Sequence, residues 1–183
     1  MSALPQQPAR SGRLASPRFY LVMGVSGSGK TVVGQALAAR LGWDFHDADD
    51  LHPAANVAKM SAGIPLTDAD RLPWLNATHE LLISRLAAGR PGVLACSALK
   101  ESYRRILLAD TSGVTVVYLQ GSYQLFRSRL ATRAAHYMSP ELLGSQFDDL
   151  EEPEHALVID ASRSVSDIVD EIAGRRAQTP KGG

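Results

Sequence analysis

Apolar runs along the chain alternate with segments that have helical periodicity. The apolar runs lack the polar alternation of a half-exposed strand, which is typical of strands covered on both faces of a parallel sheet. Strands are predicted at Phe19–Met23, Trp43–His46, Val93–Cys96, Val114–Leu119 and Leu157–Ile159. Helices are predicted at Lys30–Leu41, Pro53–Ser61, Ala69–Ala88, Lys100–Ala109, Ser122–Ala134, Pro140–Leu150 and Val165–Gly174. This order predicts an α/β fold with a parallel sheet flanked by helices.

The two ends of the chain lack a hydrophobic period. Residues 1–17 contain prolines among Gln, Ser, Ala and Arg, which predicts a disordered tail, and residues 175–183 predict a second one. The folded domain is therefore expected to span 18–174. Arginines in the first tail faintly resemble a transit peptide, but the tail has no amphipathic pattern.

Composition narrows the class of protein. A chain of 183 residues suits one domain that buries its core without disulfides. The formal net charge is zero, so no global field attracts nucleic acid or an anionic membrane. No apolar run approaches the roughly 18 residues that cross a bilayer, and the single cysteine, Cys96, excludes an internal disulfide and a cysteine-based zinc site. We expect a cytoplasmic enzyme that binds anions through local donors.

A glycine-rich turn lies between the first strand and the first helix. Its residues Gly24, Val25, Ser26, Gly27, Ser28, Gly29, Lys30 and Thr31 fit the P-loop pattern G-x-x-x-x-G-K-[ST]. The glycines let consecutive backbone N–H groups point at phosphate oxygens, and the helix that follows adds the positive end of its dipole. We expect ATP on this loop, with Lys30 acting in catalysis between the β- and γ-phosphates and the Thr31 hydroxyl binding Mg²⁺. The alternative, a glycine turn that binds nothing, does not explain why a strand precedes it and a helix follows.

Acidic residues follow the second strand, at the carboxyl edge where parallel sheets bind ligands. A kinase needs one carboxylate near Mg²⁺ and another within hydrogen-bond reach of the attacking hydroxyl. We expect Asp47 on the metal side, through water, and Asp49 as the catalytic group that orients or deprotonates the acceptor. Asp50 is interpreted as a helix cap, a role that is also the alternative for Asp49.

Segments beyond the P-loop resemble the gluconokinase family, the thermoresistant gluconate kinases of bacteria and eukaryotes. The matching residues are Asp47-Ala-Asp-Asp-Leu-His-Pro53, Asn56, Lys59-Met60, Gly63, Pro65-Leu66, Asp68-Ala-Asp-Arg-Leu-Pro-Trp74, Cys96-Ser-Ala-Leu-Lys100, Tyr103-Arg104, Ser145-Gln-Phe147 and Leu150-Glu-Glu-Pro153. The resemblance covers about residues 18–160. It implies a relative of shikimate kinase, with a P-loop NTPase fold whose five parallel strands have the order 2-3-1-4-5, and with a mobile lid. It also implies ATP and Mg²⁺ as co-reactants, phosphorylation of the terminal hydroxyl of D-gluconate, and a homodimer.

The substrate that this resemblance implies carries a carboxylate, which an arginine fork binds with paired hydrogen bonds. Arg71 is the first candidate for that contact and Arg104 the second. The other predicted substrate-binding residues in this part of the chain are Asp49, His52, Asn56, Lys59, Ser97 and Lys100. His52 is alternatively a helix cap and Lys59 a solvated helix residue. Trp74 is interpreted as a packing residue rather than a platform for the sugar.

The third strand departs from the usual P-loop pattern. It ends at Cys96-Ser97, where a P-loop NTPase usually has an acid that serves the metal. Metal binding is therefore expected from Thr31, the phosphates, water and Asp47. Cys96 is expected to be buried and unreactive, because nothing nearby marks it as a nucleophile.

A basic helix leads into the segment expected to form the lid. Arg129 and Arg133 are four residues apart and share a helix face, so both are predicted to close over the γ-phosphate and stabilise its charge in the transition state. His136 is assigned to the substrate, and Arg127 is interpreted as solvated. Ala134-Ala135 stands where gluconokinases commonly carry Lys-Gly, which removes a cation and a flexible hinge residue.

Shikimate kinase and adenylylsulfate kinase are the alternatives among enzymes, and a nucleotide-binding switch without catalysis is the alternative outside them. The Leu-His-Pro and Asp-Arg-Leu-Pro-Trp segments disfavour both alternative kinases. A switch is expected to lack the acceptor carboxylate or the lid cations, and this chain has both.

Overall fold

The computed structural model describes residues 18–132 and 140–177. Within these ranges one sheet contains β1 (Phe19–Met23), β2 (Asp44–Asp47), β3 (Gly92–Ala95), β4 (Val114–Gln120) and β5 (Leu157–Asp160). The five strands have the order β2-β3-β1-β4-β5, and every neighbouring pair is parallel. The α/β class and the strand order are confirmed.

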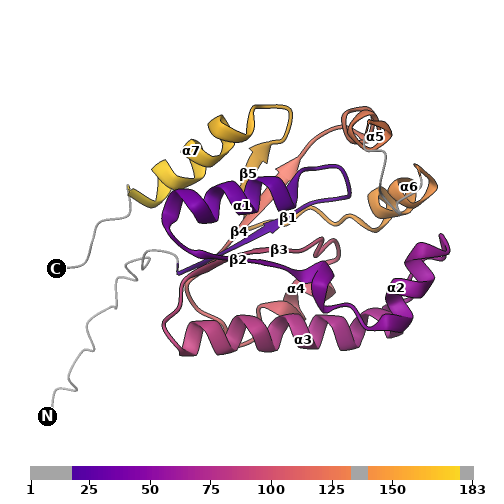
Figure 1. Cartoon of the computed structure of the whole chain (residues 1–183), viewed down its shortest axis with the longest axis horizontal. Helices are drawn as coiled ribbons and strands as arrows, with labels where there is room; N and C mark the ends of the chain where they lie inside the picture. The colour runs from indigo at the N-terminus through magenta and orange to yellow at the C-terminus, as the bar shows by residue number, and fades with distance from the viewer. Residues whose placement is uncertain (1–17, 133–139, 178–183) are drawn as a thin grey trace, which may run out of the picture.

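Helices pack on both faces of the sheet, with α1 and α7 over one face and α3 and α4 over the other (Figure 1). The helices are α1 (Lys30–Leu41), α2 (Ala54–Ser61), α3 (Asp68–Ala87), α4 (Glu101–Leu107), α5 (Tyr123–Ala131), α6 (Pro140–Asp149) and α7 (Val165–Ala177), with a 3-10 turn at Ala48–Leu51. Among these described helices, none combines the length and the apolar content that crossing a membrane requires.

The bounds of the elements differ by a few residues from those predicted. Helix α7 continues to Ala177, past the expected end of the domain at Gly174. Helix α5 ends at Ala131, and the predicted continuation to Ala134 runs into positions outside the described residues, as do the predicted tail at 1–17 and the last part of the tail at 175–183.

Strand β1 lies at the centre of the sheet and is buried along its whole length. Phe19, Leu21 and Met23 belong to the core under α3 and α4. Tyr20 and Val22 belong to the core under α1 and α7. Successive side chains of a strand point to opposite faces, so each face receives apolar residues, which explains the absence of polar alternation in this run.

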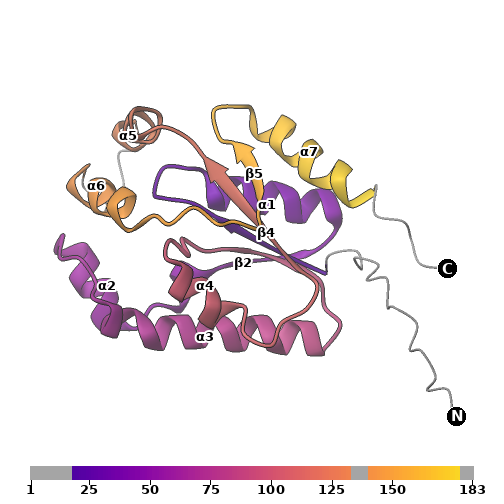
Figure 2. The same ribbon diagram turned by 180° about the vertical axis from the view of Figure 1, so that it is seen from behind.

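The loops that carry the predicted site residues leave the same edge of the sheet. The phosphate loop follows β1, Asp47 ends β2 and Ser97 follows β3. Because these neighbouring strands are parallel, their carboxyl ends meet. Helices α2, α5 and α6 stand around this edge in both views (Figure 1, Figure 2). The fold therefore places the predicted site residues of these three loops at one edge of the sheet.

Candidate active site

The phosphate loop requires glycine where its backbone turns. Gly24, Gly27 and Gly29 have φ angles of 151°, 80° and 95°, a region that residues with side chains disfavour. A Cβ on Gly27 would lie 2.7 Å from the backbone oxygen of Phe126, so glycine also lets α5 approach the loop. Lys30 begins α1, and its ammonium group folds back to donate to a loop carbonyl oxygen at 3.1 Å. The loop therefore has the curled backbone that the P-loop pattern predicts.

Asp47 connects the phosphate loop to the turn after β2. The Thr31 hydroxyl donates to Asp47 Oδ2 at 2.8 Å, and the Asp49 N–H donates to Asp47 Oδ1 at 3.1 Å. In the part of the chain that the structure describes, no cluster of three or more His, Cys, Asp or Glu side chains is placed to hold a metal. Thr31 and Asp47 supply oxygen atoms, which Mg²⁺ prefers, and Mg²⁺ takes its remaining ligands from phosphate and water. These residues fit that ion.

A pocket of about 310 Å³ opens beside the phosphate loop. The predicted site residues in its wall are Ser26, Lys30, Asp49, His52, Arg71 and Ser97. Apolar residues of the segment after α2, such as Ile64 and Leu66, form another part of the wall. The pocket therefore places the loop lysine and the predicted acceptor carboxylate around one space.

Asp49 is accessible to solvent in this concave site. Desolvation by the surrounding protein raises its pKa, with Asp47 and Asp50 adding to the increase and the charge of Lys30 opposing it. A carboxyl with a raised pKa is better matched to proton transfer near neutral pH. Its position and its pKa both suit a general base.

His52 follows the 3-10 turn and stacks on Trp74, with ring centroids 4.5 Å apart and planes 9° apart. Trp74 is 2% exposed, and its Nε1 donates to the Ala48 carbonyl oxygen at 2.6 Å. Its burial and hydrogen bond fit the interpretation of a packing residue, although its ring also contributes to the pocket wall. Burial lowers the pKa of His52 to about 4, and the charge of Arg71 contributes to this decrease. His52 is therefore neutral at pH 7.

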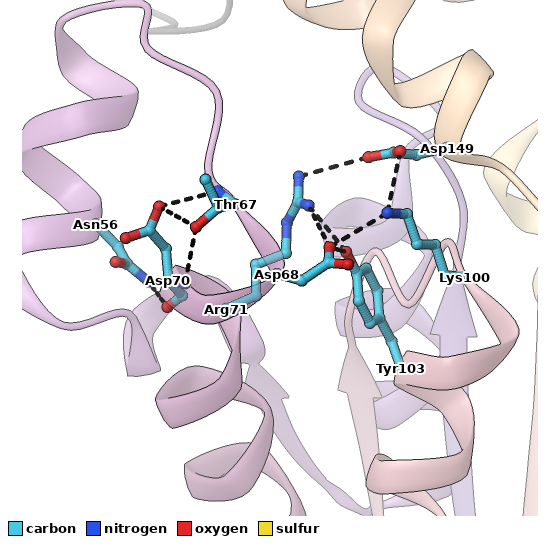
Figure 3. A network of polar contacts seen from close by, with 8 residues as sticks. All are labelled: Asn56, Thr67, Asp68, Asp70, Arg71, Lys100, Tyr103 and Asp149. Atoms are coloured by element: carbon cyan, nitrogen blue, oxygen red, sulfur yellow. Dashed lines mark hydrogen bonds and ion pairs between the residues drawn. The ribbon is translucent and has the colours of Figure 1, made fainter.

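Arg71 lies within a network of polar and charged side chains from α3, α4, α6 and the residue before α4 (Figure 3). Its guanidinium donates to the Tyr103 hydroxyl at 2.9 Å and lies 3.6 Å from the carboxylates of both Asp68 and Asp149. Lys100 pairs with the same two carboxylates at 3.2 and 3.4 Å. Two cations therefore face two anions. A substrate carboxylate has to compete with Asp68 and Asp149 for Arg71.

Asn56 and Lys59, two predicted substrate residues, lie outside the pocket wall. Asn56 is buried, and its Nδ2 donates to the Asp70 carbonyl oxygen at 2.8 Å. Lys59 pairs with the Asp70 carboxylate at 2.7 Å, and the Thr67 hydroxyl and N–H donate to the same carboxylate. Both residues therefore tie α2 to the first turn of α3, and their contact with the substrate stays a prediction.

Arg104, the second candidate for the substrate carboxylate, also lies away from the pocket. It is 4% exposed, and its Nη1 donates to the carbonyl oxygens of Ala98 and Leu99 at 2.8 and 2.9 Å. Its other nitrogens contact Glu101. Ala98 has a φ of 45°, which costs about 1 kcal/mol or more in a residue other than glycine. Arg104 therefore holds the strained loop that carries Ser97, and its contact with the substrate carboxylate stays a prediction.

Arg129 lies on α5 beside the phosphate loop. Its Nη2 donates to the Ala161 carbonyl oxygen at 2.7 Å, and its Nη1 lies 3.5 Å from the Ser28 carbonyl oxygen. It is not part of the acceptor pocket wall. Arg133 and His136 lie outside the described residues.

Gln146 is a site residue that the sequence did not assign. Its Oε1 accepts the N–H of Ser26 at 2.7 Å, and its side chain lines the pocket. A phosphate-loop amide thus meets α6 across 120 residues of sequence. The run Ser145-Gln-Phe147 is one of the segments that resemble the gluconokinase family, and this resemblance could have pointed to Gln146. Its position in the sequence does not indicate the contact with the phosphate loop.

Replacing Asp47 with asparagine is expected to raise the Mg²⁺ concentration needed for half-maximal activity by about 10- to 100-fold. The carboxylate that orients the Thr31 hydroxyl would lose its charge, while the shape of the side chain would hardly change. Activity measured against Mg²⁺ concentration at saturating ATP tests this. An unchanged Mg²⁺ dependence would show that Asp47 does not contribute to metal binding.

The Asp70 carboxylate is expected to make stability depend on pH in the acidic range. Hydrogen bonds from Lys59 and Thr67 lower the pKa of Asp70 to about 2. A depressed pKa stabilises the fold above the unfolded value of about 3.9, and this contribution is lost as pH falls through that value toward 2. Urea midpoints between pH 6 and pH 3 should fall more steeply for wild type than for Asp70→Asn. Glu80→Gln, an exposed change on the same helix, should retain the wild-type slope.

Comparison with known proteins extends over most of the chain. Residues 20–153 match the family model of an AAA domain. The chain is 45% identical over 175 residues to a probable gluconokinase of Mus musculus, covering 85% of this chain and 95% of that protein. It is 52% identical over 137 residues to a gluconokinase of Gluconobacter oxydans, covering 75% and 77%. Among solved structures, a gluconokinase from Sinorhizobium meliloti superposes with a TM-score of 0.80 at 42% identity, covering 89% and 93%.

A phosphate loop that faces an acceptor pocket at the carboxyl edge of this sheet is the arrangement of a P-loop kinase. The relatives narrow that class. The chain belongs to the gluconokinase family, which confirms the resemblance seen in its motifs.

Proposed function

We propose that this protein transfers the γ-phosphate of ATP to the terminal hydroxyl of D-gluconate and releases ADP and 6-phospho-D-gluconate. The observation that carries this proposal is the shared pocket of Lys30 and Asp49, with Asp49 held beside the Thr31–Asp47 pair. The names of the relatives supply gluconate as the acceptor.

The proposed reaction uses each part of this arrangement. Loop amides and Lys30 bind the phosphates of ATP. Thr31, and Asp47 through water, would hold Mg²⁺, which would neutralise phosphate charge when bound. Asp49 accepts the proton of the terminal hydroxyl as its oxygen attacks the γ-phosphorus. The bond from the γ-phosphorus to the bridging oxygen breaks, ADP leaves with that electron pair, and Asp49 returns its proton to solvent.

A mobile lid and an arginine contact with the gluconate carboxylate, both expected from the sequence, are part of the proposed mechanism. Arg129 is already beside the phosphate loop, 3.5 Å from the Ser28 carbonyl oxygen, which supports a place near the transferred phosphate. Arg133 is assigned to the lid, and His136 to the substrate, from the sequence alone. Arg71 remains the proposed partner of the gluconate carboxylate, in exchange for its contact with Asp149.

The proposed enzyme is a cytoplasmic homodimer with one domain, which begins at residue 18 and includes the whole of α7 to Ala177. The location is supported by the use of ATP and a metabolic sugar acid, and the dimer by the family resemblance. Light scattering coupled to size exclusion tests the dimer. A mass equal to one 19.6 kDa chain at assay concentrations would contradict it.

A panel of acceptors tests the proposed function. ADP release is measured with gluconate, other sugar acids, shikimate and adenylylsulfate under equal conditions. The highest kcat/KM is expected with gluconate. Turnover of shikimate or adenylylsulfate without turnover of gluconate would overturn the proposal.

A further inference from the structure

The buried amide of Asn56 determines which nitrogen of His52 carries the proton. Asn56 Nδ2 lies 2.8 Å from the carbonyl oxygen of Asp70, a group that only accepts hydrogen bonds (Figure 3). The Asn56 atom at this position must therefore be the nitrogen. The same nitrogen lies 3.4 Å from Nδ1 of His52. Because an amide nitrogen only donates, Nδ1 must offer its lone pair, and a neutral ring then has its proton on Nε2.

Three features keep the His52 ring neutral and in one orientation. Trp74 stacks against one face of the ring at 4.5 Å. Burial and Arg71, from α3, lower the pKa of His52 to about 4. Lys30, Asp49 and Asp149 are the other charged groups of the adjoining pocket wall, and the decrease in the pKa of His52 comes from burial and Arg71. The ring therefore presents a neutral donor at physiological pH.

The Nε2 edge of this ring is available to a ligand. His52 lines the acceptor pocket, whereas the Nδ1 side faces buried Asn56. Within residues 18–132 and 140–177, no side chain or backbone group forms a hydrogen bond at Nε2. A fixed donor on a pocket wall selects an oxygen that accepts, such as the oxygen of a hydroxyl group.

We propose that His52 donates a hydrogen bond from Nε2 to a hydroxyl oxygen of the bound sugar acid, and that Asn56 is the positioning residue that holds this tautomer. The identity of the acceptor rests on the proposed function, but the tautomer does not. Asn56 thus acts on the substrate through His52, although it lies outside the pocket wall.

The tautomer is measured directly on the wild-type protein without any acceptor. Two-bond ¹H–¹⁵N correlation spectra of ¹⁵N-histidine-labelled protein distinguish a protonated ring nitrogen from one with a free lone pair. The signals of His52 among the five histidines are those lost in His52→Phe. We expect a protonated Nε2 and an unprotonated Nδ1 at pH 7. A proton on Nδ1, or on both nitrogens, would overturn the proposal even if gluconate is the substrate.

Kinetics then test the donation. His52→Phe keeps a flat ring against Trp74 but has no donor, so KM for gluconate should rise by about tenfold while KM for ATP stays unchanged. His52→Gln, whose amide N–H reaches toward the position of Nε2, should recover most of this loss. Asn56→Ala should give a mixture of tautomers and an intermediate KM. An unchanged KM in His52→Phe, or equal losses in the Phe and Gln variants, contradicts the donation. Absence of gluconate turnover by wild type instead refutes the proposed function, while the spectra still decide the tautomer.

Discussion

Replacing Asp49 with asparagine is expected to lower kcat for gluconate by about 10²- to 10⁴-fold and to leave ATP binding nearly unchanged. Asparagine has almost the same shape but cannot take the proton of the attacking hydroxyl. The substitution leaves the amides and glycines of the phosphate loop unchanged, so nucleotide affinity should persist. Steady-state kcat at saturating substrates and calorimetric titration with ATP measure the two effects.

The neighbouring acid provides a matched control. Asp50 is exposed and does not line the pocket, so Asp50→Asn makes the same chemical change without reaching the acceptor. Its kcat should stay near that of wild type. Because desolvation in the concave site raises the pKa of Asp49, wild-type kcat/KM should fall as pH drops through that raised value, and this limb should vanish in Asp49→Asn. If Asp49→Asn had near-normal turnover and an unchanged pH profile, Asp49 would have no role in catalysis.

Replacing Lys30 with methionine is expected to lower kcat/KM for ATP by about 10³-fold. The ammonium group lies at the start of α1 and folds back over the phosphate loop, where it balances charge that grows on the phosphates during transfer. Methionine has a similar length but no charge. Steady-state kinetics with varied ATP measure the loss.

Arg40→Met serves as the control for Lys30→Met, since it removes an exposed cation from the far end of the same helix. Its kinetics should match those of wild type. Circular dichroism of both variants verifies that α1 still forms. If Lys30→Met retained wild-type kcat/KM with ATP, the loop would not bind phosphate in the way that the fold implies.

The strand, the phosphate loop and the acidic turn could be predicted from the sequence because each is defined by residues that are close together in the chain. The run Phe19–Met23 is apolar on both faces, so it predicts a central buried strand on its own. The phosphate loop is a continuous motif. Asp47 ends β2 and Asp49 follows it, so both lie at the carboxyl end of a strand that had to reach the ligand edge. In each of these cases local pattern and parallel-sheet topology suffice.

The hydrogen-bond partners that the sequence does not reveal come from distant segments of the chain. Asn56 and Lys59 have the polarity of substrate ligands, but Asp70 in the next helix binds both. The guanidinium group of Arg104 donates hydrogen bonds to carbonyl oxygens of a strained loop. Polarity alone does not reveal whether a donor meets the substrate or a buried acceptor, because that depends on how the helices pack.

Identification of the product tests the central claim most directly. Wild-type protein is incubated with Mg²⁺, ATP and ¹³C-labelled D-gluconate, and ³¹P and ¹³C spectra are followed over time. We predict equal amounts of ADP and a phosphate ester on the terminal carbon of gluconate. ATP hydrolysis without an ester, or an ester on another carbon, would contradict phosphoryl transfer from ATP to the terminal hydroxyl.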